Sequence, residues 1–469
     1  MKTKAYIYVR DNDNDYEFYS PTSLTSVTIA ATETYTVESG QILEVTGTLT
    51  NNGTAANLII KDGGQLISGP VQGTMQKEIT AYTSGGVVND NWKLIASPLA
   101  NAPVTIATAA GNYDLYVYDE STHHWLNQRV PANSITNFTP GRGYLYANET
   151  NQTLQFAGEL NYSTFAGYPL SFAGEGILQG LNLVSNPRAY QNDMWISASG
   201  VAVGDVNYLM MKADGTGFTA GTTDANGKIS VLPLRGLFVQ ATATGQTWVD
   251  ESVPSSKGIA KSENTENSGI LTLNLLGNGS LIDNAIVRLG KGHNLGKVVL
   301  NENSTKLYIS QGSNEYAIVR SVAQGELPVN FKAAENGSYT LSIETKNVDL
   351  NYLHLVDKLT GNDIDLLMTP SYTFEAKTGD NENRFRLVFS GSSTSSETAE
   401  PFAYYNGSEW VIENDGEATL QVIDVMGRVI KSEVLSGNAS TNTANLSAGV
   451  YVLRLVDSQK VKTQKIVVE

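Results

Sequence analysis

Apolar residues recur along this chain in short alternating runs rather than at helical spacing. In 271–275 (LTLNL) and 450–455 (VYVLRL), for example, apolar side chains repeat with the two-residue period of a strand that buries one face. Gly and Asn, which favour tight turns, separate the runs. The pattern predicts an all-β, multidomain protein with almost no helix.

The first eighty residues form one group of such runs. Between residues 21 and 80 the apolar positions fall in even, short clusters, separated by turn sequences such as Glu38-Ser39-Gly40 and Asp62-Gly63-Gly64. Even spacing of this kind predicts a β-solenoid-like stack of rungs or a β-meander over 1–80. Because so few rungs are present, we expect the end of a solenoid that belongs to a longer parent protein.

Residues 81–251 contain a duplication, with copies at about 92–160 and 181–250. Pro98 and Pro187 close similar apolar runs 89 residues apart, and the two Pro-x-Arg-Gly sequences place Arg142 and Arg235 93 residues apart. We expect two packed sheets related by pseudo-symmetry, with Asp119 equivalent to Asp214. Arg142 and Arg235 are expected to pair with these carboxylates and fix the sheets, or to bind an anionic ligand.

The remainder of the chain divides at two polar linkers. Residues 252–268 are small and polar, as is 391–400 (GSSTSSETAE). Between them, 269–390 alternates short strands and turns in the manner of a jelly-roll-like β-sandwich. Residues 401–469 predict a separate, immunoglobulin-like sandwich whose final apolar strand docks in a sheet.

Three sequence motifs stand in order in this last segment: Asp424-x-x-Gly427-Arg428, then Leu446-x-x-Gly449-x-Tyr451, then Lys465-Ile466-Val467. Together they resemble the C-terminal sorting domain of the type IX (Por) secretion system of Bacteroidetes. The resemblance implies a protein that the type IX machinery exports to the outside or to the outer-membrane cell surface, with a cut near 391–400. It also implies turns at Gly427 and Gly449, and it covers only 401–469.

The two preceding blocks resemble a region that recurs before sorting domains in large, adhesin-like surface proteins. The first functional hypothesis is therefore a non-catalytic portion of a secreted or surface-anchored protein with an adhesin-like or scaffold role. The alternative is an accessory region of a secreted glycan-active or proteolytic enzyme whose catalytic domain is missing from this chain. An upstream catalytic domain would favour the alternative, and further β repeats would favour the first hypothesis.

Charge and composition narrow the range of partners. The net charge of −16, from 31 Lys and Arg against 47 Asp and Glu, disfavours binding to nucleic acid. The absence of Cys excludes disulfides and thiolate metal sites. No run of about 18 apolar residues occurs, so no membrane-spanning helix is predicted.

No local catalytic motif is present, neither a Gly-x-Ser-x-Gly elbow nor a Walker loop nor His-Glu-x-x-His. The paired catalytic carboxylates of glycosidases leave no such local motif, so a glycosidase site stays an open alternative. We therefore expect that the chain is not an enzyme and needs no cofactor, with calcium as the one possible exception.

Two sets of residues are candidates for ligand binding. Asp11, Asp13 and Asp15 place carboxylates at alternate positions, as calcium ligands often are, but the EF-hand pattern fails at the following positions and a solvated acidic turn is the alternative. Candidate residues for an extracellular glycan or protein ligand are the aromatic side chains Trp125, Tyr144 and Tyr146. The alternative interpretation is that these rings pack in the core of a sheet.

Overall fold

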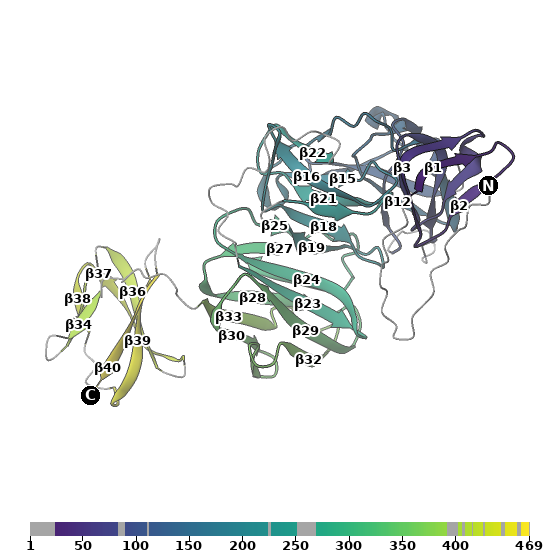
Figure 1. The fold of residues 1–469 in the computed structure, drawn as a ribbon. Coiled ribbons are helices and arrows are strands. Elements are labelled where there is room, and N and C mark those ends of the chain that lie inside the picture. The colour runs from purple at the N-terminus through teal and green to yellow at the C-terminus, as the bar shows by residue number, and fades with distance from the viewer. Residues whose placement is uncertain are drawn as a thin grey trace. The chain divides into compact units, whose positions relative to one another are not determined.

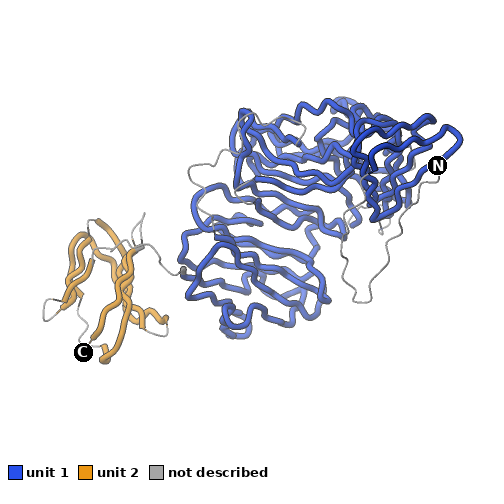
Figure 2. Tube along the Cα trace, in the orientation of Figure 1, with its two compact units in different colours: residues 1–392 blue, residues 393–469 orange. Residues whose placement is uncertain are grey.

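The computed structural model describes residues 24–82, 90–109, 112–223, 227–250, 269–391 and 402–468, without 406–408, 415, 425–426, 442–445 and 457–460. The chain divides into two compact units, residues 1–392 and 393–469, which Figure 2 colours separately. Of the residues that the structure describes, 58% lie in strands and 3% in helices. The prediction of an all-β protein with almost no helix is confirmed.

The first unit begins with two parallel stacks of short strands. One stack has the order β1-β3-β5 and the other β2-β4-β6. The strands are β1 (Leu24–Ile29), β2 (Tyr35–Val37), β3 (Ile42–Asn51), β4 (Leu58–Ile60), β5 (Gln65–Ile67) and β6 (Val71–Ile79), with the 3₁₀ turn η1 (Ala55–Asn57). A meander would pair successive strands antiparallel, so this parallel stacking is that of a β-solenoid.

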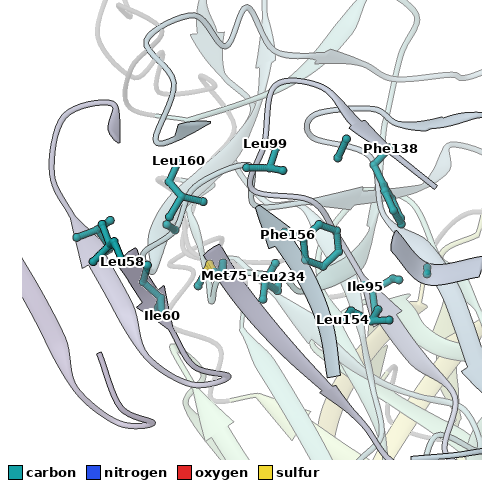
Figure 3. Close-up of a cluster of buried hydrophobic side chains, with 14 of the residues drawn as sticks. Leu58, Ile60, Met75, Ile95, Leu99, Phe138, Leu154, Phe156, Leu160 and Leu234 are labelled. Atoms are coloured by element: carbon teal, nitrogen blue, oxygen red, sulfur yellow. The ribbon is translucent and has the colours of Figure 1, made fainter. Parts of the chain in front are cut away.

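The solenoid shares its core with the first copy of the duplication. Strand β6 pairs antiparallel with β13 (Gln152–Leu160) along its whole length. Figure 3 shows Leu58 and Ile60 of the solenoid in one buried cluster with Phe156 of β13. The first copy therefore supplies the apolar surface on which the last rungs close.

The two copies form sheets with the same strand order. In the first, β10-β9-β12-β7 are neighbours, and in the second β19-β18-β21-β15 are. Their bounds are β7 (Lys93–Ile95), β9 (Tyr113–Asp119), β10 (His124–Asn127), β12 (Tyr144–Asn148), β15 (Leu181–Ser185), β18 (Asn207–Met211), β19 (Phe218–Thr222) and β21 (Gly236–Gln240). All pairs within these sheets are antiparallel. This correspondence is what a duplication produces.

Shorter elements lie within the copies and in the segment between them. They are β8 (Ala102–Pro103), α1 (Thr105–Thr108), η2 (Pro131–Asn133), β11 (Asn137–Phe138), β14 (Tyr168–Pro169), η3 (Gly176–Leu178), β16 (Asn192–Ala198), β17 (Val201–Ala202), β20 (Ile229–Val231) and β22 (Gln246–Asp250). Strands β22, β16, β17 and β20 of the second copy form a further sheet together with β14 of the connecting segment.

The pairing register corrects one expected equivalence. Tyr118 lies opposite Trp125 in the first copy, as Met211 lies opposite Phe218 in the second. The register therefore places Asp119 at the position of Lys212, and the expectation that it matches Asp214 was wrong by two residues. Both aspartates accept hydrogen bonds from the backbone of their own turns. The two turn sequences are therefore similar although the aspartates occupy different positions relative to the strands.

The copies meet across a pseudo-two-fold axis at their Pro-x-Arg-Gly segments. Arg142 forms a backbone bridge with Val184 of the second copy, and Arg235 forms the equivalent bridge with Ile95 of the first. The glycines that follow approach each other so closely that a β-carbon on Gly236 would lie 3.4 Å from the α-carbon of Gly143. Because two backbones come together there, a β-carbon on either glycine would force its neighbours to shift.

Replacing Gly143 with alanine is expected to lower the stability of the first unit by about 1–3 kcal/mol. The new β-carbon would lie 2.7 Å from the carbonyl oxygen of Val184, a backbone atom that cannot rotate away. The matched control is Gly337→Ala, where a β-carbon meets nothing within 4 Å and φ is not left-handed. Urea unfolding of the full chain would show a lower midpoint for the first variant only, and equal midpoints would contradict the prediction.

Residues 269–391 form one 11-stranded sheet. Along it the order is β31-β30-β33-β28-β26-β27-β24-β23-β29-β32, with β25 beside β27. The strands are β23 (Ile270–Gly277), β24 (Ser280–Leu289), β25 (Leu295–Gly296), β26 (Lys306–Gln311), β27 (Asn314–Ser321), β28 (Gln324–Lys332), β29 (Gly337–Lys346), β30 (Leu350–Asp357), β31 (Asp363–Asp365), β32 (Ser371–Ala376) and β33 (Phe385–Gly391).

This sheet curls until its two ends meet over one core, so we call it the barrel. Leu355 of β30 and Phe374 of β32 come from opposite ends of the strand order and belong to the same buried cluster. The Tyr372 hydroxyl donates across the gap to the carboxylate of Asp357, at 3.0 Å. The two walls expected of a sandwich are therefore parts of a single sheet.

A buried ionic cluster joins the barrel to the second copy. The carboxylate of Asp283 lies 2.6 Å from Nζ of Lys297 and 3.4 Å from Nζ of Lys212, and none of the three side chains is more than 5% exposed. Burial lowers the pKa of Lys297, while the charge of Asp283 opposes that change. The barrel and the copies are consequently parts of one compact unit.

The second unit is a sandwich of two sheets around its own core (Figure 1). The three-stranded sheet has the order β34-β35-β38 and the four-stranded sheet β37-β36-β39-β40. The strands are β34 (Ala403–Tyr405), β35 (Trp410–Ile412), β36 (Glu417–Asp424), β37 (Val429–Ser436), β38 (Ala439–Thr441), β39 (Gly449–Val456) and β40 (Val461–Val468). An immunoglobulin-like sandwich was predicted for this segment.

Candidate functional site

The first motif of the C-terminal segment builds the turn between β36 and β37. The Asp424 carboxylate accepts a hydrogen bond from the backbone N–H of Arg428 at 2.9 Å and from its Nε at 2.8 Å. Gly427 has a φ of 77°, in the left-handed region that glycine adopts without strain. The spacing of the motif thus follows from one carboxylate that closes a five-residue turn.

The second motif fixes the start of β39. The Tyr451 hydroxyl donates to the carbonyl of Ser447 at 2.8 Å, and Leu446 packs against the core. Gly449 is the first residue of β39, so the expectation that it lies in the turn itself was wrong. Its φ is not left-handed, and Gly449 is required here less strictly than Gly427.

The third motif lies on β40, an edge strand of the four-stranded sheet. Ile466 is 1% exposed and belongs to the core, whereas its neighbours Lys465 and Val467 point to the opposite face. Val467 is 58% exposed. The fold by itself accounts for Ile466 and gives no reason for the other two side chains.

The outward side of the four-stranded sheet carries several exposed apolar residues, and we call this surface the outer face. Val450 pairs with Val467 across β39 and β40, and Val452 pairs with Lys465 beside them. Val434 of β37 is 77% exposed. The core does not use these side chains, which leaves the outer face available for contact with another molecule.

The aromatic candidates lie elsewhere and do not form a binding platform. Tyr144 and Tyr146 are 1% and 0% exposed, so the hypothesis that they present their rings to a ligand was wrong. The residue between them faces the other side of the strand, and both sides of this sheet are covered by the rest of the first unit. Trp125 is half-buried and packs 5.8 Å from the ring of Phe238 of the second copy.

The remaining candidates are titratable groups. Asp11, Asp13 and Asp15 lie outside the described residues. Within the described ranges, no group of three or more His, Asp or Glu side chains is placed to hold a metal ion. The one histidine with a carboxylate partner there, His354, lies 2.8 Å from Asp363 at the surface of the barrel. No helix in the described part of the chain is long and apolar enough to cross a membrane.

Comparisons with known proteins agree with the C-terminal motifs. A family model described as a secretion system C-terminal sorting domain matches residues 408–469. No curated protein matches the chain. A solved structure described as "Biofilm associated protein - BSP domain" shares 10% identity over 84% of this chain and 95% of its own length. Its TM-score of 0.13 is too low for an argument about fold or function.

The family match and the geometry of the three motifs apply to the same strands, β36 to β40. Asp424, Gly427, Arg428, Tyr451 and Ile466 have structural roles there that explain their spacing. Residues 408–469 are a type IX C-terminal sorting domain, and the chain is a secreted or cell-surface protein.

Proposed function

We propose that the chain is a non-catalytic surface protein, exported by the type IX machinery, with an adhesin-like or scaffold role. The observation that carries the proposal is the division of the chain: the sorting domain forms one unit, and a much larger all-β unit precedes it. A unit made of extended sheets with shared cores is suited to present a surface rather than to close around a substrate.

The environment of the histidines supports the non-catalytic part of the proposal. The ring of His123 has partners on both nitrogens, the Tyr118 hydroxyl at 3.2 Å and the carbonyl of Glu175 at 2.8 Å. His354 stacks on Tyr352 and contacts Asp363. In these contacts the imidazoles support turns and strands: His123 bonds to a tyrosine hydroxyl and a backbone carbonyl, and His354 to a carboxylate.

Expression of the full chain in a host that carries a type IX system tests the proposal. The matched control is the same chain ended at residue 400, before the sorting domain. Cells that display the full chain are expected to attach to mucin-coated plastic, or to aggregate with one another, several-fold more than control cells. They should hydrolyse model glycoside and peptide substrates no faster.

Surface display without any gain in attachment or aggregation would overturn the adhesin-like and scaffold roles. New hydrolysis by purified full-length chain would overturn the non-catalytic assignment.

A further inference from the structure

A groove of about 440 Å³ lies where the solenoid meets the second copy. One wall comes from β3 and β5 of the solenoid, with Ile42, Gln65 and Ile67. The other comes from the loop before β16, from β16 itself and from β20, and includes Tyr190, Gln191, Asn192, Asp193 and Ser230. The groove thus combines one aromatic and two aliphatic side chains with amide, hydroxyl and carboxylate groups.

Hydrogen bonds hold the two walls at a fixed separation. The backbone N–H of Leu66 donates to the carbonyl of Ala189 at 2.8 Å, and that of Gln191 donates to Oε1 of Gln65 at 2.7 Å. Within the second wall, the side-chain amide of Gln191 donates to Oγ of Ser230, also at 2.7 Å. The groove is therefore formed before any ligand arrives.

Buried polar side chains hold the loop that carries Tyr190 in place. The Asn186 amide donates to the carbonyls of Tyr190 and Val231, both at 2.7 Å. Arg188 is 4% exposed and its Nε lies 2.6 Å from the carboxylate of Asp250, which is fully buried. Support of this kind holds the side chains that would contact a ligand, such as Tyr190, in place, as a binding site requires.

The first copy shows that the fold does not need these residues. Aligned on Pro98 and Pro187, it has Leu99 where the second copy has Arg188, and Asn101 where the second has Tyr190. Ala102 then stands at the position of Gln191. The same strand order forms with an apolar side chain beneath this loop and small side chains along it. The polar and aromatic set is specific to the second copy.

We propose that this groove binds a neutral saccharide. Amide and carboxylate groups, such as those of Gln65 and Asp193, can each bond to adjacent sugar hydroxyls, while Tyr190 covers a C–H face of the ring. The volume of the groove lies within the range of about 300–1,000 Å³ that is typical of small-ligand sites. The Asp193 carboxylate lines the groove, whereas its cationic partner Lys228, 4.0 Å away, does not, and with the net charge of −16 this disfavours an acidic saccharide.

This inference rests on the proposed function, because a saccharide ligand presupposes that the chain meets its surroundings outside the cell. The test uses purified full-length chain on an array of neutral oligosaccharides of glucose, mannose, galactose and N-acetylglucosamine, with uronic-acid and sialylated oligosaccharides beside them. At least one neutral oligosaccharide is expected to bind. Its affinity is then measured by calorimetry for the wild type and the variants.

Tyr190→Ala and Asp193→Asn are each expected to weaken binding tenfold or more. Asn101→Ala, at the position in the first copy that corresponds to Tyr190, is the matched control and should leave the affinity unchanged. All variants are compared by their urea midpoints. The side chain of Asp193 is 45% exposed, so Asp193→Asn is expected to keep the fold. If Tyr190→Ala does not fold, the affinity of Asp193→Asn alone tests the saccharide site.

Binding of acidic oligosaccharides alone, or of none, overturns the inference. So does a neutral saccharide whose affinity is the same for Asp193→Asn as for the wild type. Failure of the proposed function looks different: a chain that binds a neutral saccharide in solution while displaying cells neither attach nor aggregate.

Discussion

Replacing Ile466 with aspartate is expected to abolish delivery of the chain to the cell surface. The side chain is 1% exposed in the core of the sorting domain, and an unpaired carboxylate there costs several kcal/mol. A domain of this size has a total stability of about 3–10 kcal/mol, at about 0.05–0.15 kcal/mol per residue. The sandwich should therefore unfold, and the strands that present the sorting motifs would be lost with it.

The fraction of tagged chain accessible to protease on intact cells measures this effect. Tyr404→Asp is the matched control, because it introduces the same charge at a residue that is 51% exposed on β34 of the opposite sheet. We expect the control to reach the surface in wild-type amounts. Equal surface levels for both variants would contradict the role assigned to the folded sorting domain.

In the barrel, Asp357→Ala is expected to cost about 3–5 kcal/mol, the loss typical of a buried ion pair that keeps only one partner. The Asp357 carboxylate is fully buried and accepts hydrogen bonds from Nε and Nη2 of Arg384, at 3.0 and 2.8 Å. It also accepts one from the Tyr372 hydroxyl. Without it the guanidinium of Arg384, 3% exposed, stays buried and keeps one carboxylate partner, Asp380, at the longer distance of 3.7 Å from Nη1.

Hydrogen exchange of the amides in β30 and β33 reports this loss directly, because these strands carry or adjoin the two residues. The matched control is Glu326→Ala, which breaks the exposed pair of Glu326 and Arg386, 3.4 Å apart. Exposed pairs contribute about 0–1 kcal/mol, so exchange should change little. Similar protection in the Asp357 variant and the control would show that the buried pair does not hold the barrel together.

The stabilisation from Asp357 should also depend on pH. Burial by itself raises the pKa of Asp357, but the hydrogen bonds from Arg384, Leu359 and Tyr372 outweigh it and hold the pKa below its ordinary value. A depressed pKa means that the contribution is complete above the unfolded-state pKa of about 3.9 and is lost as the pH falls through the folded-state value. The stability difference between wild type and Asp357→Ala should therefore be smaller at pH 3 than at pH 7.

Several features of the fold were determined by sequence patterns that act locally. Alternation within runs such as 450–455 predicts that one face of the strand is buried, and the structure buries Leu453 and Leu455 while Val450 lies on the outer face. The Pro-x-Arg-Gly landmarks predicted the duplication, and both of their glycines lie where the backbones of the two copies meet. The sorting motifs were recognisable because Asp424, Gly427 and Arg428 act within a single turn.

Features that depend on distant partners were decided by the tertiary structure alone. Glu120 gives no signal in the sequence, yet its buried carboxylate accepts hydrogen bonds from the backbone N–H groups of Gly174 and Gly180, more than fifty residues away. The groove likewise joins residues of the solenoid to residues of the second copy. Alternation specifies the face on which a side chain lies but not the strand opposite it, because register and closure are set by packing over the whole unit. The local sequence therefore determined strands, repeats and the sorting domain, whereas the curled barrel, the buried ion pairs and the groove arise only when distant segments pack together.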